Sequence, residues 1–451
     1  MRRRLILAAA AAAALALAGL AFGLMRGHPE TTPSPEAPPA GSIEIPTKSS
    51  PPSPRTQGRP PPPPTTGGTP PPGPPTTTAP SAPPPIASPA VQKRPLLVGV
   101  VEDTVKLTDR AGVARRMTML REAGFRALRM TTLWAPGLTR PTPIEGQVLA
   151  NAVRAARVNR IRVYLSVFAA RARETPTTPA RRREFAAFTA ALVRALPWVR
   201  DVIVGNEPNL NNFWMPQFDP GGGSASPRDY NALLADTYDA VKGVSSEVRV
   251  LGGALAPRGG DNPNASRHTH SPTRFLREWG SAYRASGRAA PVMDALAFHP
   301  YLEYSRLAPE FAHPRTTTIS LADYGKLVAA LRDAFDGTAQ PGSSLPIAYT
   351  EFGIQSRIPD RLRDLYVNGG DPAARDAVDR TTQAAYYARA IELAACQPSV
   401  DALVLFLALD EPDLARWQSG VFYVDGSWKP SRVAVRAAAR RVEAGDVRCE
   451  G

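Results

Sequence analysis

The sequence predicts an α/β fold in which eight parallel strands alternate with helices, a (β/α)8 or TIM barrel. Three observations lead to this prediction. From residue 95 to about residue 440, short runs of β-branched and apolar residues alternate with amphipathic helical stretches. This part of the 451-residue chain has the length of one barrel domain. Two of the strand-like runs end in a glutamate, Glu207 or Glu351, at the edge of the sheet where α/β barrels carry their chemistry.

The expected strands are short and almost continuously apolar, which is typical of parallel strands that are buried on both faces. In chain order they are residues 96–101, 125–130, 161–167, 202–204, 248–255, 293–298, 347–350 and 400–409. Eight such runs follow one another without an internal repeat. Their number predicts a closed ring of strands.

A helix is expected after every strand, as a parallel sheet requires. The expected helices are residues 111–123, 150–158, 180–196, 230–244, 274–286, 321–335, 373–396 and 431–443. Gly124 follows the first helix and is the residue type that most often closes one.

Residues 1–27 have the pattern of an export signal. Three arginines, Arg2–Arg4, precede an apolar run over residues 5–25. The run is long enough to span a bilayer, and Ala16-Leu17-Ala18 offers a cleavage site for a signal peptidase. The pattern fits a cleaved signal peptide and a retained membrane anchor equally. Either reading makes the protein extracellular or bound to the cell surface.

Residues 28–94 are rich in Pro, Thr, Ser and Gly, with five consecutive prolines at 60–64. Such a composition cannot bury a core, so we expect a disordered linker with polyproline character. It is either a stiff spacer for a tethered enzyme or a plain linker to a secreted domain. The barrel then occupies residues 95–451.

The formal net charge of +14 raises the question of an anionic partner. No basic cluster with interleaved aromatic residues and no nucleic-acid-binding motif is evident, so a nucleic-acid partner is not predicted. Arginines are scattered over helical stretches such as 181–183 and 440–441, which favours a solvated surface. Affinity for anionic polymers of the cell envelope is the alternative.

The only two cysteines are Cys396 and Cys449. In an exported protein an even number of cysteines favours a disulfide, which here would join the C-terminal tail to the helix before the eighth strand. Two unpaired buried thiols are the alternative. No further ligands have the spacing of a zinc site, so no metal is predicted.

The segments Asn206-Glu207-Pro208 and Thr350-Glu351-Phe352-Gly353 resemble two strand ends of the clan A retaining glycoside hydrolases, in particular the β-xylosidase-like and cellulase-like branches. The resemblance extends over roughly residues 95–440. It implies a (β/α)8 barrel without a cofactor. Glu207, after the fourth strand, would be the acid/base, and Glu351, after the seventh, the nucleophile. The alternative for both is a surface glutamate at a strand end.

The resemblance also implies roles for four companion residues. Asn206 would bind the sugar 2-hydroxyl, although a lone Asn at a strand end is more often a turn residue. His299 and Tyr301 would face Glu351, with Tyr301 donating a hydrogen bond to it; a core histidine and a rim tyrosine are the alternative. Arg129 would support Glu351 electrostatically, since a buried arginine requires a carboxylate partner.

Four aromatic residues fall in the expected loops above the barrel, where they would bind sugar rings or serve in ordinary packing: Trp134, Trp214, Trp417 and Tyr423. The chain departs from the clan at the eighth strand, where a tryptophan often stands and this chain reads Leu405-Phe406-Leu407-Ala408-Leu409. Whether Trp417 reaches the first sugar subsite is therefore open.

Taken together, these features favour an exported, retaining glycoside hydrolase that acts on a polysaccharide or oligosaccharide of the cell envelope or the environment. A monomer is expected, with a carbohydrate as its substrate and residues 5–25 as a potential membrane tether. Two other classes stay open: a non-catalytic carbohydrate-binding barrel, and a structural protein of the cell envelope. The pairing of Glu207 with Glu351 favours catalysis, because a binding protein needs no matched acid and nucleophile.

Overall fold

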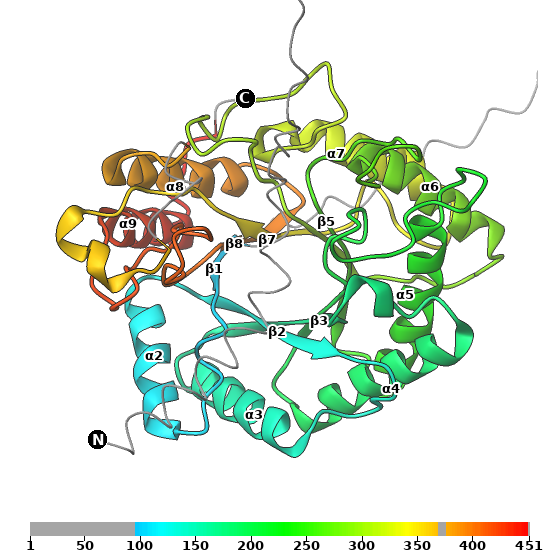
Figure 1. Cartoon of the computed structure of the whole chain (residues 1–451), viewed down its shortest axis with the longest axis horizontal. Helices are drawn as coiled ribbons and strands as arrows, with labels where there is room; N and C mark the ends of the chain where they lie inside the picture. The colour runs from blue at the N-terminus through cyan, green and yellow to red at the C-terminus, as the bar shows by residue number, and fades with distance from the viewer. Residues whose placement is uncertain (1–94, 369–375, 450–451) are drawn as a thin grey trace, which may run out of the picture. The chain divides into compact units, whose positions relative to one another are not determined.

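The computed structural model describes residues 95–368 and 376–449, which form a closed barrel of eight parallel strands (Figure 1). Each strand pairs with the next one in the sequence, and the ring closes between β1 and β8, where Val98 lies opposite Leu403. The predicted (β/α)8 fold is confirmed. The predicted anchor (1–27) and linker (28–94) lie outside the described residues. Within the described ranges, no helix combines the length and the apolar composition needed to cross a membrane.

All eight predicted strands are present, with shifted ends. They are β1 (Leu97–Val101), β2 (Ala127–Trp134), β3 (Arg162–Ala169), β4 (Asp201–Val204), β5 (Arg249–Leu255), β6 (Ala295–Phe298), β7 (Ile347–Phe352) and β8 (Val400–Leu405). The prediction extended the eighth strand to residue 409. Residues 406 and 408 are buried because the following loop folds back over the barrel, and not because the strand continues.

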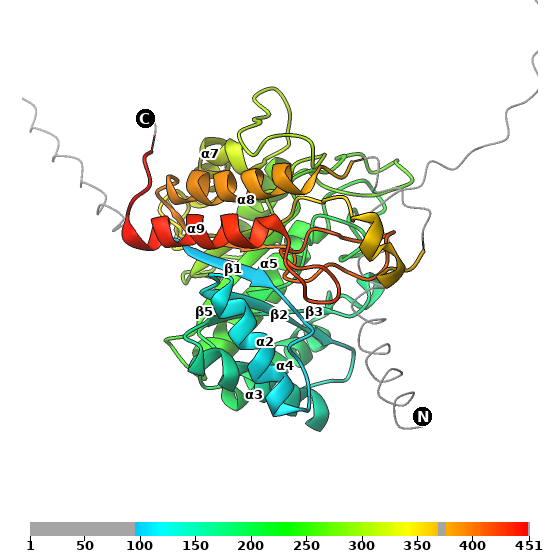
Figure 2. The same cartoon turned by 90° about the vertical axis from the view of Figure 1, so that its left-hand side faces the viewer.

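The helices encircle the strands, and α8 and α9 lie side by side (Figures 1 and 2). They are α2 (Arg110–Glu122), α3 (Pro143–Val158), α4 (Pro179–Ala195), α5 (Ser226–Lys242), α6 (Pro272–Ala285), α7 (Tyr324–Phe335), α8 (Arg380–Ala395) and α9 (Pro430–Ala444), with three short 3-10 turns, η1 (Ala172–Glu174), η2 (Leu321–Asp323) and η3 (Asp360–Leu365).

Capping residues explain the two largest differences between the predicted and observed helix ends. Helix α3 begins seven residues before the predicted 150, because the Thr142 hydroxyl accepts the N–H of Glu145 and Pro143 occupies the first turn. Helix α8 begins after the predicted 373, at the point where the Asp379 carboxylate accepts the N–H groups of Thr381 and Thr382.

The strand side chains alternate between two cores. Outward-facing residues pack against the helices in one large cluster. The inward-facing cluster is made mostly of small residues: Ala127, Tyr164, Ile203, Leu251, Ala254, Ala295, Ala297, Ala348 and Ala402. Small side chains fill the narrow interior without strain and leave room at the C-terminal ends of the strands for larger polar groups.

Paired charges fill the opposite end of the barrel. Asp201 accepts a hydrogen bond of 2.9 Å from Arg162 and lies 3.2 Å from Arg249, which in turn lies 2.6 Å from Asp401. The buried Asp201 and the half-buried Asp401 therefore each have a cationic partner, as burial of charge requires. These residues come from the first positions of β3, β4 and β5 and from β8, so they close the end of the barrel remote from Glu207 and Glu351.

The predicted disulfide is present. Cys396 follows the last residue of α8, and its Cα atom lies 5.3 Å from that of Cys449 near the C-terminus. The bond joins the segment after α9 to the end of α8 and closes a loop with a sequence separation of 53 residues.

Replacing both Cys396 and Cys449 by serine should lower the free energy of unfolding by about 4 kcal/mol, because the bond restricts the unfolded chain. Urea denaturation of the oxidised protein and of the double variant measures the difference. Reduced wild-type protein is the control and should match the variant. A loss below about 1 kcal/mol, or two alkylatable thiols in the protein isolated without reductant, would contradict the prediction.

Candidate active site

Glu207 is held at the C-terminal end of β4 by an unusual backbone path. Gly205 has a φ of +85°, and a Cβ there would lie 3.0 Å from the ring of Tyr230, so glycine is required. Glu207 itself has a φ of +40°, and its N–H donates to the carbonyl of Ala254 on β5. Non-glycine residues in this region are strained and cluster at functional sites. The turn directs the Glu207 side chain to the top of the barrel.

Glu351 is turned toward the barrel axis by a bulge in β7. Tyr349 lies opposite Leu403 and Phe352 opposite Leu405, so three steps along β7 match two along β8. Tyr349 and Phe352 both pack on the outer core. The extra residue between them changes the alternation of side chains, and Glu351 points inward as a result. Bulges near active sites often redirect a side chain in this way.

The two carboxylates approach each other with His299 between them. One ligand atom of each of Glu207, His299 and Glu351 lies within 4.8 Å of the others. The Nδ1 atom of His299 is 3.0 Å from Oε1 of Glu207, whereas its Nε2 atom is 3.7 Å from Oε1 of Glu351. His299 therefore does face Glu351, as expected, but its hydrogen bond is to Glu207.

Arg129 and Tyr301 bind the two oxygens of Glu351, as the resemblance implies. The Arg129 guanidinium donates to Oε1, and the Tyr301 hydroxyl donates to Oε2 at 2.9 Å. Burial works to raise the pKa of Glu351, but His299, Arg129 and the hydrogen bonds from Arg129 and Tyr301 outweigh it, so this pKa lies below its ordinary value. Glu351 is therefore held as a carboxylate.

The pKa of Glu207 is shifted in the opposite direction to that of Glu351. Burial raises the pKa of its carboxyl group above the ordinary value, the nearby Glu351 adds to the rise, and the hydrogen bond and charge of His299 only partly offset it. Its second oxygen, Oε2, has no hydrogen-bond partner among the described residues. Two carboxyl groups whose environments move their pKa values apart are suited to one acidic and one nucleophilic role.

Asn206 and Ser166 complete the surroundings of Arg129. Its guanidinium donates to the Asn206 amide oxygen at 2.8 Å and to the Ser166 hydroxyl at 3.2 Å. The Asn206 NH2 group is left buried without a partner in the described part of the chain, so it is free to donate to a ligand. Ser166 was not predicted. The signal was the alternation in β3, where Tyr164 and Phe168 on either side also point inward.

Trp417 reaches the site from the loop between β8 and α9. Its ring centroid lies 5.4 Å from that of Tyr301 and 5.5 Å from that of Phe406, which is the first residue after β8. Tyr301 binds Glu351, so Trp417 lies one side chain away from this carboxylate. Trp417 thus stands beside Tyr301 although the strand itself carries no tryptophan.

The other three aromatic residues are not at the site. Trp134 is separated from the inward-facing Arg129 by five positions on β2, so it faces outward and packs against Phe185 of α4. Trp214 packs against Tyr230 of α5, and Tyr423 is buried in a loop cluster. The expected sugar contacts of Trp134 and Trp214 are corrected: strand alternation and helix packing place both in the core.

Glu411 closes the loop that presents Trp417, a contact that no sequence pattern indicated. The Glu411 N–H donates to the Trp417 carbonyl at 2.9 Å, and the Trp417 N–H donates to the Glu411 carboxylate at 3.0 Å. Two reciprocal bonds between the same residues fix the ends of the loop. Glu411 therefore holds the tryptophan in position.

The cluster of Glu207, His299 and Glu351 also has the composition of a metal site. However, the oxygen of Glu351 nearest to His299 already carries an ion pair with Arg129. A divalent cation would have to displace or tolerate this fixed positive charge at close range, which is unfavourable. The cluster is therefore better suited to acid–base chemistry than to holding a metal.

Known structures share this architecture. The protein GH5_18 from Streptomyces cattleya, solved in complex with GlcNAc, aligns with a TM-score of 0.53 and 16% identity over 78% of this chain and 81% of its own. The β-glycosidase BGL167 aligns with a TM-score of 0.50 and 14% identity over 79% of this chain and 98% of its own. A glucosidase from Croceicoccus marinus aligns with a TM-score of 0.50 and 14% identity over 78% of this chain and 69% of its own. The chain has the barrel fold of these glycoside hydrolases. No family model and no curated protein matches its sequence.

Proposed function

We propose that the protein is a retaining glycoside hydrolase that cleaves O-glycosidic bonds by double displacement. The observation that carries this proposal is the pair Glu207 and Glu351, buried together at one end of the barrel with pKa shifts in opposite directions. Retaining enzymes place their carboxyl groups roughly 5–5.5 Å apart, whereas inverting enzymes leave about 6.5–9.5 Å for a water molecule. A spacing of ligand atoms within 4.8 Å favours the retaining case.

In the first step, a Glu351 oxygen attacks the anomeric carbon while Glu207 donates its proton to the departing glycosidic oxygen. The product alcohol leaves, and the sugar remains as an ester of Glu351. Arg129 and Tyr301 keep Glu351 ionised before the attack. Asn206 offers its free NH2 group to a hydroxyl of the sugar, where a bond that strengthens in the transition state would accelerate the reaction.

In the second step, Glu207, now a carboxylate, removes a proton from water. The water oxygen attacks the anomeric carbon and releases Glu351. Glu207 thereby recovers its proton, and the sugar leaves with its original stereochemistry. His299 hydrogen-bonds to Glu207 and lies near Glu351, so it can stabilise the negative charge on whichever of the two carboxylates carries it.

A panel of aryl glycosides and of cell-wall and plant polysaccharides tests the proposed activity directly. Proton NMR of the first product formed distinguishes retention from inversion. Hydrolysis should persist in EDTA, since no step uses a metal. A protein that binds sugars but releases no aglycone from any member of the panel would be the non-catalytic barrel, and the proposal would be wrong.

Glu411 allows a graded test of the role of Trp417. Glu411→Ala should raise KM about fivefold with little change in kcat, because the lost hydrogen bond is worth about 1 kcal/mol and serves to hold the tryptophan. Glu411→Gln keeps an acceptor for the Trp417 N–H and should recover most of the affinity. Steady-state kinetics on one aryl glycoside gives both constants. Equal losses in kcat for both variants would contradict a positioning role.

Export and the division into anchor, linker and barrel belong to the same proposal. The pattern of residues 1–27 and the proline-rich composition of 28–94 support a barrel that acts outside the cytoplasm, either free or tethered. A chain that begins at Val91 should then keep its kcat/KM on a small glycoside. A loss of more than about tenfold, roughly 1.4 kcal/mol of transition-state stabilisation, would contradict this division.

A further inference from the structure

A shallow groove on the outside of the barrel lies between α3 and α4, at the ends of these helices remote from the catalytic carboxylates. It measures about 240 Å³ and is lined by Ala150, Val153, Arg154, Ala195, Leu196, Pro197 and Trp198. A second groove of about 190 Å³ runs along the other side of α3, and Arg154 lines both. The two grooves flank α3 and share Arg154 as a lining residue.

Trp198 is the exposed aromatic residue of this surface. It follows α4, and 40% of its surface is accessible. The guanidinium of Arg157 lies over its ring at 4.3 Å from the centroid. This cation–π contact holds the indole in place at the wall of the groove and keeps a positive charge next to it.

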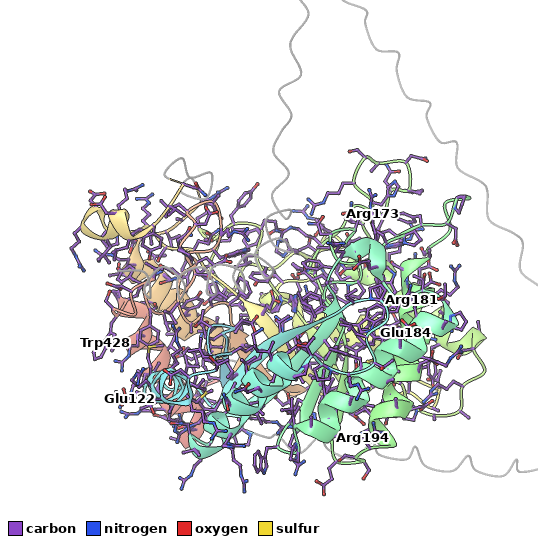
Figure 3. The ribbon with its side chains drawn as sticks, turned by 60° about the horizontal axis from the view of Figure 1, so that its bottom comes forward. Glu122, Arg173, Arg181, Glu184, Arg194 and Trp428 are labelled. Atoms are coloured by element: carbon purple, nitrogen blue, oxygen red, sulfur yellow. A yellow bond between two sulfur atoms is a disulfide. The ribbon has the colours of Figure 1, made fainter. Side chains whose placement is uncertain are left out.

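Four arginines of α3 and α4 near the groove have no acidic partner among the described residues, whereas Arg200, which donates to the carbonyl of Pro197 in the lining, pairs with Glu247. The chain carries no Asp or Glu between residues 146 and 183 other than Glu174, and none between 185 and 200. Arg154, Arg157, Arg160 and Arg194 are exposed, and none of them forms an ion pair with another described residue. The opposite end of α4 differs: Arg181 pairs with Glu184 and Arg182 with Asp236. Figure 3 shows Arg181 and Glu184 together at one end of α4 and Arg194 at the other.

We infer that this groove binds an anionic polysaccharide, one whose sugar rings carry carboxylate or phosphate groups. The C–H face of a sugar packs well on an indole, and guanidinium groups bind carboxylates and phosphates in a two-pronged fashion. The groove offers both kinds of contact, with no carboxylate in its lining to repel an anion. The choice of a glycan rests on the proposed function; the anionic character rests on the arginines alone.

Two other anionic partners fit the surface less well. A membrane surface favours a projecting amphipathic face, whereas this surface is hollowed. Single-stranded nucleic acid favours a row of stacking aromatic residues along a basic groove, whereas Trp198 is the one aromatic side chain in the lining of the two grooves. Both alternatives become outcomes of the test.

The test measures binding of the full chain to immobilised polymers by biolayer interferometry. The probes are polygalacturonate, a glycerol phosphate polymer, and dextran as the neutral reference. Trp198→Ala and the double variant Arg154→Gln/Arg157→Gln should each weaken binding to at least one anionic polymer about tenfold or more. Binding should decline with added salt, because exposed charges are screened. No variant should bind dextran.

Matched controls separate the groove from general surface charge. Trp428 is also exposed (Figure 3). The guanidinium of Arg432 lies over its ring at 3.6 Å from the centroid, so Trp428→Ala removes a similar pair elsewhere. Arg277→Gln/Arg332→Gln removes the same net charge from α6 and α7. Both controls should bind like the wild type. All variants should keep wild-type kcat/KM on a small glycoside, which shows that they are folded.

Absence of binding to both anionic polymers, or equal binding by all variants, would overturn the inference. So would binding to phosphatidylglycerol vesicles or a 20-nucleotide DNA that is lost in the groove variants while the anionic glycans do not bind. The inactive Glu351→Gly variant should bind the polymers normally. Its binding therefore distinguishes a failure of the groove from a failure of the proposed hydrolysis.

Discussion

Glu351→Gly should reduce kcat/KM on the order of 10⁴-fold or more on every glycoside, because it removes the atom that attacks the anomeric carbon. Sodium azide should restore turnover, since a small anion fits in the space left by the side chain beside Arg129 and attacks in its place. Only one displacement then occurs, so the glycosyl azide has inverted stereochemistry. The measurements are the initial rate with and without azide, and proton NMR of the product.

This substitution also leaves the Arg129 guanidinium buried without its carboxylate. The variant should therefore be less stable, by about 3–5 kcal/mol if no anion takes the vacant place. Thermal unfolding in the presence of azide separates lost stability from lost chemistry. Glu443→Gln removes a surface carboxylate that pairs with Arg126 and should change neither property. Retention of more than about one-hundredth of the activity without azide would contradict the nucleophile assignment.

Glu207→Ala should have an effect that depends on the leaving group. On substrates with a poor leaving group, such as an alkyl glycoside, the kcat/KM of the variant should fall about 10²–10⁴-fold, which is the rate enhancement that general acid catalysis supplies. A dinitrophenyl glycoside needs little protonation and should keep a fast first step. Its hydrolysis should then stall at the ester of Glu351, and azide should release a product of retained stereochemistry. Stopped-flow measurement of the aglycone burst checks this expectation.

The pH dependence gives an independent test of the same residue. Glu351 must be ionised, and its pKa is lowered, so wild-type activity should fall only in strongly acidic solution. Glu207 must be protonated, and its pKa is raised, so activity should fall again as the pH rises through that value. Glu207→Ala, assayed on the dinitrophenyl substrate, should lose the alkaline limb of the kcat/KM profile and keep the acidic one. Persistence of the alkaline limb would assign it to another group.

Much of the barrel follows from local patterns in the chain. Short, continuously apolar, β-branched runs such as Val202–Val204 are typical of buried parallel strands, and Gly124 follows the first helix as expected. The strand ends that carry Glu207 and Glu351 could also be found, because proline or glycine stops each run just beyond its glutamate. Hydrophobic periodicity, composition and turn residues are local properties of the chain, so they can be recognised without knowing which distant segments pack together.

The assembly of the site required the tertiary structure. The bulge that turns Glu351 inward depends on the register between β7 and β8, and the hydrogen bond from His299 to Glu207 joins side chains 92 positions apart. The same holds for Trp417, which reaches Tyr301 through the path of a loop, while Trp134 is turned into the core by the alternation of β2. Register, loop path and side-chain direction are set by packing among distant segments. The sequence therefore determined which residues stand at the strand ends, and only the closed barrel decided which of them meet.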